Sequence, residues 1–114
     1  MDDLIAFLRA RLDDDEQTAR AASDGWYGYD PEQSIAFVPV EDTQHIARHS
    51  PARVLAEVNA KRQLIDRYGR AFENRRAHPD DLASAGALLA LHGAVKLLAL
   101  PYADHPDYRD DWRP

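Results

Sequence analysis

Residues 42–68 read DTQHIARHSPARVLAEVNAKRQLIDRY and contain the clearest helix start in the chain. Ser50 can cap a helix with its hydroxyl, and Pro51 suits the first helical position, where no N–H donor is needed. Apolar side chains then recur at helical spacings of three, four and seven residues, at Val54, Leu55, Val58, Ile65 and Tyr68. Because this spacing gives a helix one apolar face, we expect a helix from residue 50 that ends at Gly69 or continues to about residue 76.

Two more long helices are expected, one before and one after this stretch. Residues 2–22 carry an apolar stripe and begin with acidic residues, which the helix dipole favours. Residues 82–100, LASAGALLALHGAVKLLAL, form an apolar run that is stopped by Pro101. A short helical turn, capped by Asp42 or Thr43, is expected to end at His49.

Residues 26–40 differ in character from these helical segments. Aromatic residues come before the turn signal Asp30-Pro31, and residues 34–40 are rich in Ile, Phe and Val. Such a pattern predicts two short strands joined as a β-hairpin. The expected fold is therefore mostly α, a three-helix domain with a small β-hairpin between helices 1 and 2. We expect one domain over residues 1–101, followed by a tail, residues 102–114, that packs on the domain or is partly mobile.

Composition excludes several classes of function. The chain has 114 residues and no cysteine, which excludes disulfides, thiolate zinc sites and cysteine nucleophiles. A formal net charge of -6 argues against nucleic acid as a partner of the protein as a whole. The first residues are acidic where a signal peptide would be basic, which predicts a cytoplasmic location.

The apolar run at residues 82–100 is long enough to raise the question of a membrane span. Lys96 and His92 lie within it, and a lysine is costly inside a bilayer. We therefore expect a buried core helix and no membrane partner. Small residues recur along one side of this helix, at Ala83, Gly86, Ala90 and Gly93. They would allow a neighbouring backbone to approach closely, so this helix is the expected surface for a protein partner or for self-association.

His45 and His49 are spaced i, i+4, which places both imidazoles on one face of a helix. Zinc sites on helices present two ligands in this way, and a third could come from Glu16, which lies outside the apolar pattern of residues 2–22, or from His105 or Asp42. A zinc ion with an open position could activate water for hydrolysis. The glutamate of the HExxH motif is absent, and the same pair can instead serve in packing or capping.

The helix expected at residues 50–76 carries seven basic and three acidic residues. Its arginines could bind nucleic acid, and binding would then depend steeply on salt. The segments around it are acidic, so pairing of charges within the chain explains the same pattern.

Three blocks of the sequence resemble a known family: MDDLIAFLRARLDDDEQTARAA, HIARHSPARVLAEVNAKRQLID and LLALPYADHPDYRDDWRP. This is an uncharacterised actinobacterial family, number 6221 among the domains of unknown function, found in streptomycetes, related bacteria and their phages. A looser similarity connects Asp42, His45, Ile46, Ala47 and residues 55–58 with early-region Ead-type phage proteins. An apolar aromatic is typical there at the position of His45, which implies a packing role for this residue.

Neither resemblance implies an activity. The expected function is therefore a non-enzymatic accessory or protein-interaction module of actinobacterial or phage origin. One alternative is a small metal-dependent hydrolase that uses His45, His49 and Glu16. The other is a nucleic-acid-binding accessory protein that uses the basic helix at residues 50–76.

Overall fold

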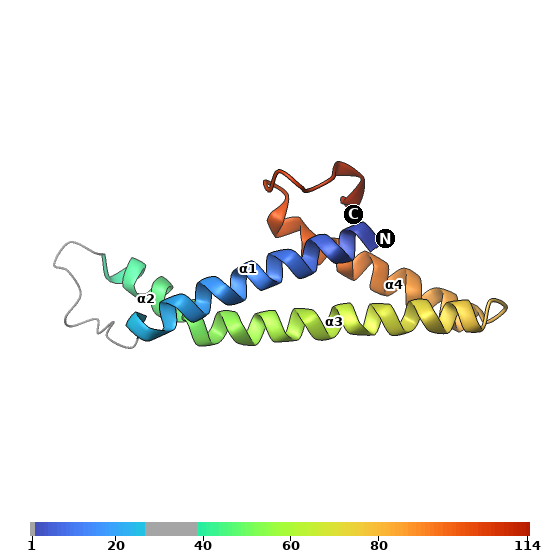
Figure 1. Ribbon diagram of the computed structural model, residues 1–114, viewed down its shortest axis with the longest axis horizontal. Coiled ribbons are helices and arrows are strands. Elements are labelled where there is room, and N and C mark those ends of the chain that lie inside the picture. The colour runs from blue at the N-terminus through green and yellow to red at the C-terminus, as the bar shows by residue number, and fades with distance from the viewer. Residues whose placement is uncertain (1, 27–38) are drawn as a thin grey trace. The chain divides into compact units, whose positions relative to one another are not determined.

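The computed structural model describes residues 2–26 and 39–114, and Figure 1 shows the order of their helices. Four α-helices lie in this part of the chain: α1 (Asp2–Trp26), α2 (Val40–Arg48), α3 (Pro51–Ala77) and α4 (Leu82–Ala99). Two single-turn 3-10 helices follow, η1 (Leu100–Tyr102) and η2 (Asp110–Trp112). Most of the described backbone is therefore helical.

The predicted three-helix fold with a β-hairpin is wrong. The described residues contain four α-helices and no strand. The two ends of the expected hairpin are helical, because Trp26 is the last residue of α1 and Val40 is the first of α2; residues 27–38, the rest of it, lie outside the described residues. Gly25 costs only about 1 kcal/mol in a helix, a penalty that α1 bears. The expected turn at residues 42–49 is a full helix of nine residues.

The helix start at Ser50 is confirmed. The backbone N–H of Arg53 donates to the Ser50 hydroxyl oxygen at 3.3 Å, and the N–H of Val54 donates to the Ser50 carbonyl at 3.0 Å. Of the two predicted ends, the longer one is observed, because α3 continues through Gly69 to Ala77. Gly69 is helical there, with nothing within 4 Å of the place where a Cβ would lie.

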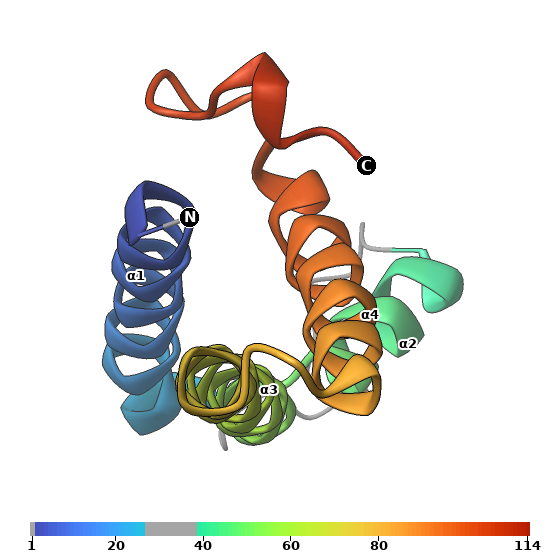
Figure 2. The ribbon, with the colours of Figure 1, turned by 90° about the vertical axis from the view of Figure 1, so that its right-hand side faces the viewer.

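The chain divides into two compact units. The larger consists of Met1–Leu12 with Ala60–Pro114, and the smaller of Asp13–Asn59. In the larger unit, Figure 2 shows α3 between α1 and α4, with the chain after α4 extending beyond them. Its buried apolar core comes from all of these segments: Leu4, Phe7, Leu8, Leu12, Ile65, Tyr68, Val95, Ala99 and Trp112. In the smaller unit, Ala19, Thr43 and Val58 are buried.

The start of α4 is fixed by Asp81. Its carboxylate accepts a hydrogen bond from the backbone N–H of Ala83 at 3.1 Å, and its carbonyl accepts one from the Ser84 hydroxyl at 2.8 Å. The carboxylate therefore satisfies a helix N–H that would otherwise lack a partner.

We expect Asp81→Ala to lower the free energy of unfolding by about 1 kcal/mol, the usual cost of losing an N-cap. Urea denaturation followed by circular dichroism measures this change. Asp80→Ala is the matched control, because Asp80 is exposed and its carboxylate makes no hydrogen bond to the described residues. Equal losses in the two variants would contradict the capping role.

Candidate interaction surface on helix α4

All of the exposed residues of α4 are leucine, alanine or glycine. Three of its six leucines are strongly exposed: Leu82 is 87% exposed, Leu89 73% and Leu97 58%. Leu100, the first residue of η1, is 37% exposed. We call this surface the apolar face of α4, and it consists of Leu82, Ala83, Gly86, Ala87, Leu89, Ala90, Gly93, Leu97 and Leu100. Neither a charged nor a hydrogen-bonding side chain lies on it.

The polar residues of α4 lie on its other side. Ser84 is buried together with Val95 and Ala99, and His92 and Lys96 are partly covered. In a helix on the surface of a soluble monomer, polar residues would face the water and apolar ones the core. The apolar side of α4 thus faces outward from the larger unit.

The prediction of a buried core helix at residues 82–100 is therefore half right. The helix is confirmed, but only 17% of its most apolar 18-residue window is buried. By length and composition alone, Leu82–Tyr102 would also suffice to cross a membrane. A buried core helix would have its leucines covered, whereas Leu82, Leu89 and Leu97 of this helix are exposed.

Two glycines leave a gap in the apolar face. Gly86 and Gly93 lie one turn before and one turn after Leu89, and a Cβ added at either would meet no atom within 4 Å. The face therefore carries a protruding leucine flanked by two positions without side chains. A neighbouring helix could approach closely at both glycines.

His92 lies at the edge of the covered side, with its ring centroid 6.4 Å from that of Tyr68. Burial lowers the pKa of His92 below the ordinary value of 6.5, and the positive charge of Lys96 lowers it further. The unfolded chain therefore takes up this proton more readily than the folded one.

We expect the free energy of unfolding to fall as the pH drops below about 6.5, through the interval down to the lowered pKa of folded His92. At pH values well above 6.5 the imidazole is neutral in both states, so this contribution no longer changes with pH. Urea titrations between pH 7.5 and 5 of the wild type and of His92→Gln measure the effect, with the pH range set by the histidine pKa. An unchanged pH dependence in His92→Gln would contradict it.

His45 and His49, the predicted metal ligands, lie side by side on the smaller unit. Both are exposed, and their ring centroids are 4.5 Å apart. Glu16, the predicted third ligand, accepts hydrogen bonds from Arg20, with a shortest distance of 2.9 Å. Nowhere in residues 2–26 and 39–114 do three or more His, Asp or Glu side chains gather closely enough to hold a metal ion. The zinc site stays a prediction.

His105, an alternative third ligand, belongs to the larger unit. Its Nδ1 accepts a hydrogen bond from the backbone N–H of Asp107 at 3.0 Å and lies 3.1 Å from the Arg11 guanidinium. With two donors directed at Nδ1, that nitrogen carries no proton in this arrangement. His105 thus fixes the tail to α1.

A hollow of about 310 Å³ lies beside His49 in the smaller unit. Its lining is mostly apolar, with Ala19, Ala22, Pro51 and Val54 beside Asp15, Thr18 and His49. Nucleophilic catalysis by a hydroxyl requires a hydrogen bond to its base, and the structure records none between Thr18 and His49.

A second hollow, of about 450 Å³, lies between α1 and α3 in the larger unit. Charges of both signs line it, including Asp2, Arg9, Glu73 and Arg76. Tyr68 lies in its wall, and burial raises the pKa of its hydroxyl, with the nearby Asp2 carboxylate adding to the shift. Arg76 pairs with Glu73 at 3.7 Å. These mixed charges select for no particular ligand.

The basic charge of α3 is partly neutralised within the helix. Arg53 pairs with Glu57 at 3.2 Å, as Arg76 does with Glu73. Arg75 instead donates to backbone carbonyls that follow α3, one of them His78 at 3.2 Å. The arginines of α3 therefore do not form one continuous unpaired row.

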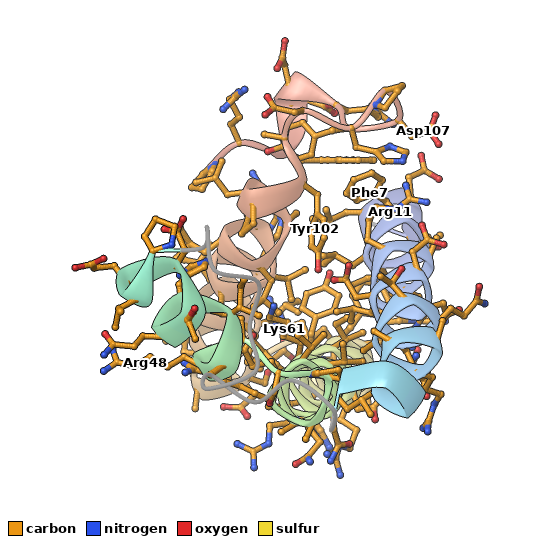
Figure 3. All side chains as sticks on the ribbon, turned by 90° about the vertical axis from the view of Figure 1, so that its left-hand side faces the viewer. Phe7, Arg11, Arg48, Lys61, Tyr102 and Asp107 are labelled. Atoms are coloured by element: carbon orange, nitrogen blue, oxygen red, sulfur yellow. The ribbon has the colours of Figure 1, made fainter. Side chains whose placement is uncertain are left out.

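The tail packs on the first turns of α1, and Figure 3 shows Phe7 and Arg11 on the side of α1 that faces it. Four tail rings surround the Phe7 ring, with centroid distances of 6.4, 5.6, 5.9 and 5.1 Å to Tyr102, His105, Tyr108 and Trp112. Arg109 adds an ion pair to Asp3 at 3.2 Å. This aromatic cluster joins the two ends of the chain.

Together, the fold and this surface define a small helical protein with an exposed apolar helix. All of residues 1–114 match a family described as Family of unknown function (DUF6221), so the chain belongs to this family. This match confirms the resemblance to family 6221 that three blocks of the sequence show. No curated protein and no solved structure matches the chain.

Proposed function

We propose that the protein is a non-enzymatic interaction module that associates with itself through the apolar face of α4. One observation carries the proposal, namely that the exposed residues of this helix are all leucine, alanine or glycine. Soluble monomers rarely expose a large continuous apolar patch, and such patches usually mark interaction sites. Covering the leucines removes apolar surface from water, which is the main favourable contribution to protein association.

The occupant of this face has to be apolar too, because a polar partner would lose its hydrogen bonds to water without replacement. The same face on a second copy meets this requirement. Nothing on it is charged, so two copies can meet without repulsion between like charges. The rest of the chain is acidic, with a formal net charge of -6. The apolar face is therefore the part of α4 best suited to self-contact.

A lipid bilayer would fit the polar side of α4 poorly. Ser84, His92 and Lys96 would have to leave the larger unit and enter hydrocarbon, and the lysine alone costs roughly 2.5–3.5 kcal/mol at a span centre. The buried contacts of Val95 and Ala99 would be lost as well. An assembly of copies avoids both costs. It covers the apolar side of α4 and leaves Ser84, Val95 and Ala99 packed in the larger unit.

The size of the face indicates a reversible assembly. The 18 residues of α4 extend over about 27 Å, at about 1.5 Å per residue. One helix face of this length is smaller than the roughly 800 Å² that each partner contributes to a standard interface. We therefore expect an equilibrium between monomer and assembly at micromolar concentrations.

Sedimentation velocity across a concentration series tests the proposal. We expect the mass to rise from the 12.9 kDa of one chain towards a multiple of it as the concentration increases from about 1 to about 500 µM, the range around a micromolar Kd. A mass that stays at one chain throughout this series would overturn the proposal.

A metal-dependent hydrolase at His45 and His49 is the alternative. The adjacent rings favour it, while the ion pair of Glu16 with Arg20 leaves the third ligand unassigned. Elemental analysis of protein purified without an affinity tag tests it. About one zinc per chain, with a melting temperature that falls on chelation, would support the alternative; less than about 0.1 zinc per chain would remove it.

A nucleic-acid-binding role for the helix at residues 50–76 is the second alternative, and binding that weakens steeply with added salt would support it. We also infer an actinobacterial or phage origin and a location in the bacterial cytoplasm, or in the host cytoplasm if the gene is carried by a phage. The origin rests on the sequence resemblance, and the location on the acidic first residues.

A further inference from the structure

We infer that two copies of the chain pair through α4 in antiparallel orientation, with the two-fold axis next to Leu89 and Ala90. This inference rests on the proposed function and specifies the partner, the direction and the register. It comes from two independent features of α4: the shape of its apolar face, and the charges at the two ends of the helix.

Shape sets the register. Leu89 protrudes from the face, and Gly86 and Gly93 leave open positions one turn to either side of it. The Leu89 side chain of a second copy fits over these glycines, in the way that side chains of one helix enter the spaces of another. A two-fold axis at this point makes the same contact twice, because residue i meets residue j and residue j meets residue i.

Charge sets the direction. Asp80 and Asp81 lie at the start of α4. Lys96 lies near its end and is partly covered; it comes seven residues, about two turns, after Leu89 and so lies at the edge where the apolar face meets the polar side. With Leu89 over the midpoint between the partner's glycines, Lys96 comes within about one helical turn of the partner's Asp80 and Asp81. A parallel pair would instead place aspartate beside aspartate and lysine beside lysine. The helix dipoles also favour the antiparallel pair, since each N-terminus meets a C-terminus.

The path of the chain agrees with this direction. The tail leaves α4 at its C-terminal end (Figure 1). In a parallel pair the two tails would start side by side, whereas the antiparallel pair separates them by the length of the helix. Both copies use the same face in this contact, so the pair closes at two chains and leaves no apolar face of α4 open for a third.

Cysteine cross-linking can test the arrangement without interference, because the chain has no cysteine of its own. Ala90→Cys places a thiol beside the axis in both copies, close enough for a disulfide in the antiparallel pair. In a mixed pair, Ala83→Cys of one copy lies opposite Leu97→Cys of the other. In a pair made of one variant only, the two thiols are about 20 Å apart, because positions 83 and 97 are 14 residues apart at about 1.5 Å per residue. Disulfides require Cα atoms within about 7 Å.

The experiment measures the rate of disulfide formation under mild oxidation, with exposed Gln63→Cys on α3 as the control for random collision. We expect fast cross-linking of Ala90→Cys and of a mixture of Ala83→Cys with Leu97→Cys. Each of the latter two variants alone should react no faster than the control. Sedimentation of the wild type accompanies the series.

The outcomes separate the inference from the proposed function. Fast self-linking of Ala83→Cys alone and of Leu97→Cys alone would indicate a parallel pair, which overturns the inference and leaves self-association intact. If every variant forms disulfides only as slowly as Gln63→Cys while the mass still rises with concentration, the chains associate through another surface. This result would overturn both the inference and the proposed function. Control rates together with a constant mass of one chain would also overturn both.

Discussion

Leu89→Glu is expected to weaken self-association at least about 100-fold. Leu89 is 73% exposed in the single chain and lies at the centre of the apolar face. In the pair, two carboxylates would enter an apolar contact near the axis, with no cation on the face to meet them. Burying an unpaired charge costs several kcal/mol, and each 1.4 kcal/mol changes the dissociation constant tenfold. Sedimentation velocity of the variant should therefore show the mass of one chain across the concentration series.

Gln63→Glu is the control for this variant. Gln63 is exposed on α3, so the substitution adds the same charge to the chain without changing the shape of a side chain or touching α4. It should associate like the wild type. Circular dichroism of Leu89→Glu should retain the helical signal, because the leucine it replaces contributes little to the core. Equal association of Leu89→Glu and the wild type would place the contact elsewhere.

Local signals in the sequence predicted the helices well and the hairpin badly. The start of α3 follows from Ser50 and Pro51, whose capping chemistry is independent of the rest of the fold. The strand prediction rested on the β-preferences of residues such as Val40, which are weak and depend on context. Val40 instead begins α2, in which Thr43 is buried. Packing of Thr43 is a tertiary effect that propensities do not contain.

The sequence predicts one part of the candidate surface, the row of small residues, but not the exposure of the leucines beside it. The spacing of Ala83, Gly86, Ala90 and Gly93 places small residues on one side of the helix, but the apolar composition predicts a buried helix, whereas Leu82, Leu89 and Leu97 are exposed. A further signal was present: Ser84, His92 and Lys96, the polar residues of α4, are spaced eight and four apart and so share one side of the helix. Which side faces the core could not be derived from the spacing. The structure places the polar side inward, because Ser84 bonds to Asp81 and His92 lies beside Tyr68.

The histidine pair illustrates a different limit. The i, i+4 spacing of His45 and His49 correctly placed their rings together. A third ligand must come from another element, and single-sequence reasoning has no means of choosing among Glu16, His105 and Asp42. The partners of Phe7 in the aromatic cluster could not be predicted for the same reason, because they come from the far end of the chain. Aromatic residues in a tail indicate docking, but they do not identify the surface that receives them.

Phe7→Ala is expected to have the largest effect on stability, a loss of about 3–5 kcal/mol in the free energy of unfolding. Phe7 is only 6% exposed, and four tail rings and the Arg11 guanidinium contact it. Its removal leaves a cavity beneath the tail and frees Trp112, which is 8% exposed in the intact protein. Urea denaturation gives the stability change. In a Trp26→Phe background, where Trp112 is the one remaining tryptophan, its emission should shift to longer wavelength before global unfolding.

Phe72→Ala is the matched control, because it removes the same side chain from a position that is 37% exposed. Its ring centroid lies 6.5 Å from that of Tyr68. The structure records no ring contact between Phe72 and the tail. We expect it to cost half as much or less, since the transfer and cavity contributions both scale with burial. The emission of Trp112 should not change in this variant. An equal loss of stability in both variants, or an unshifted emission in Phe7→Ala, would show that the tail is not held by Phe7.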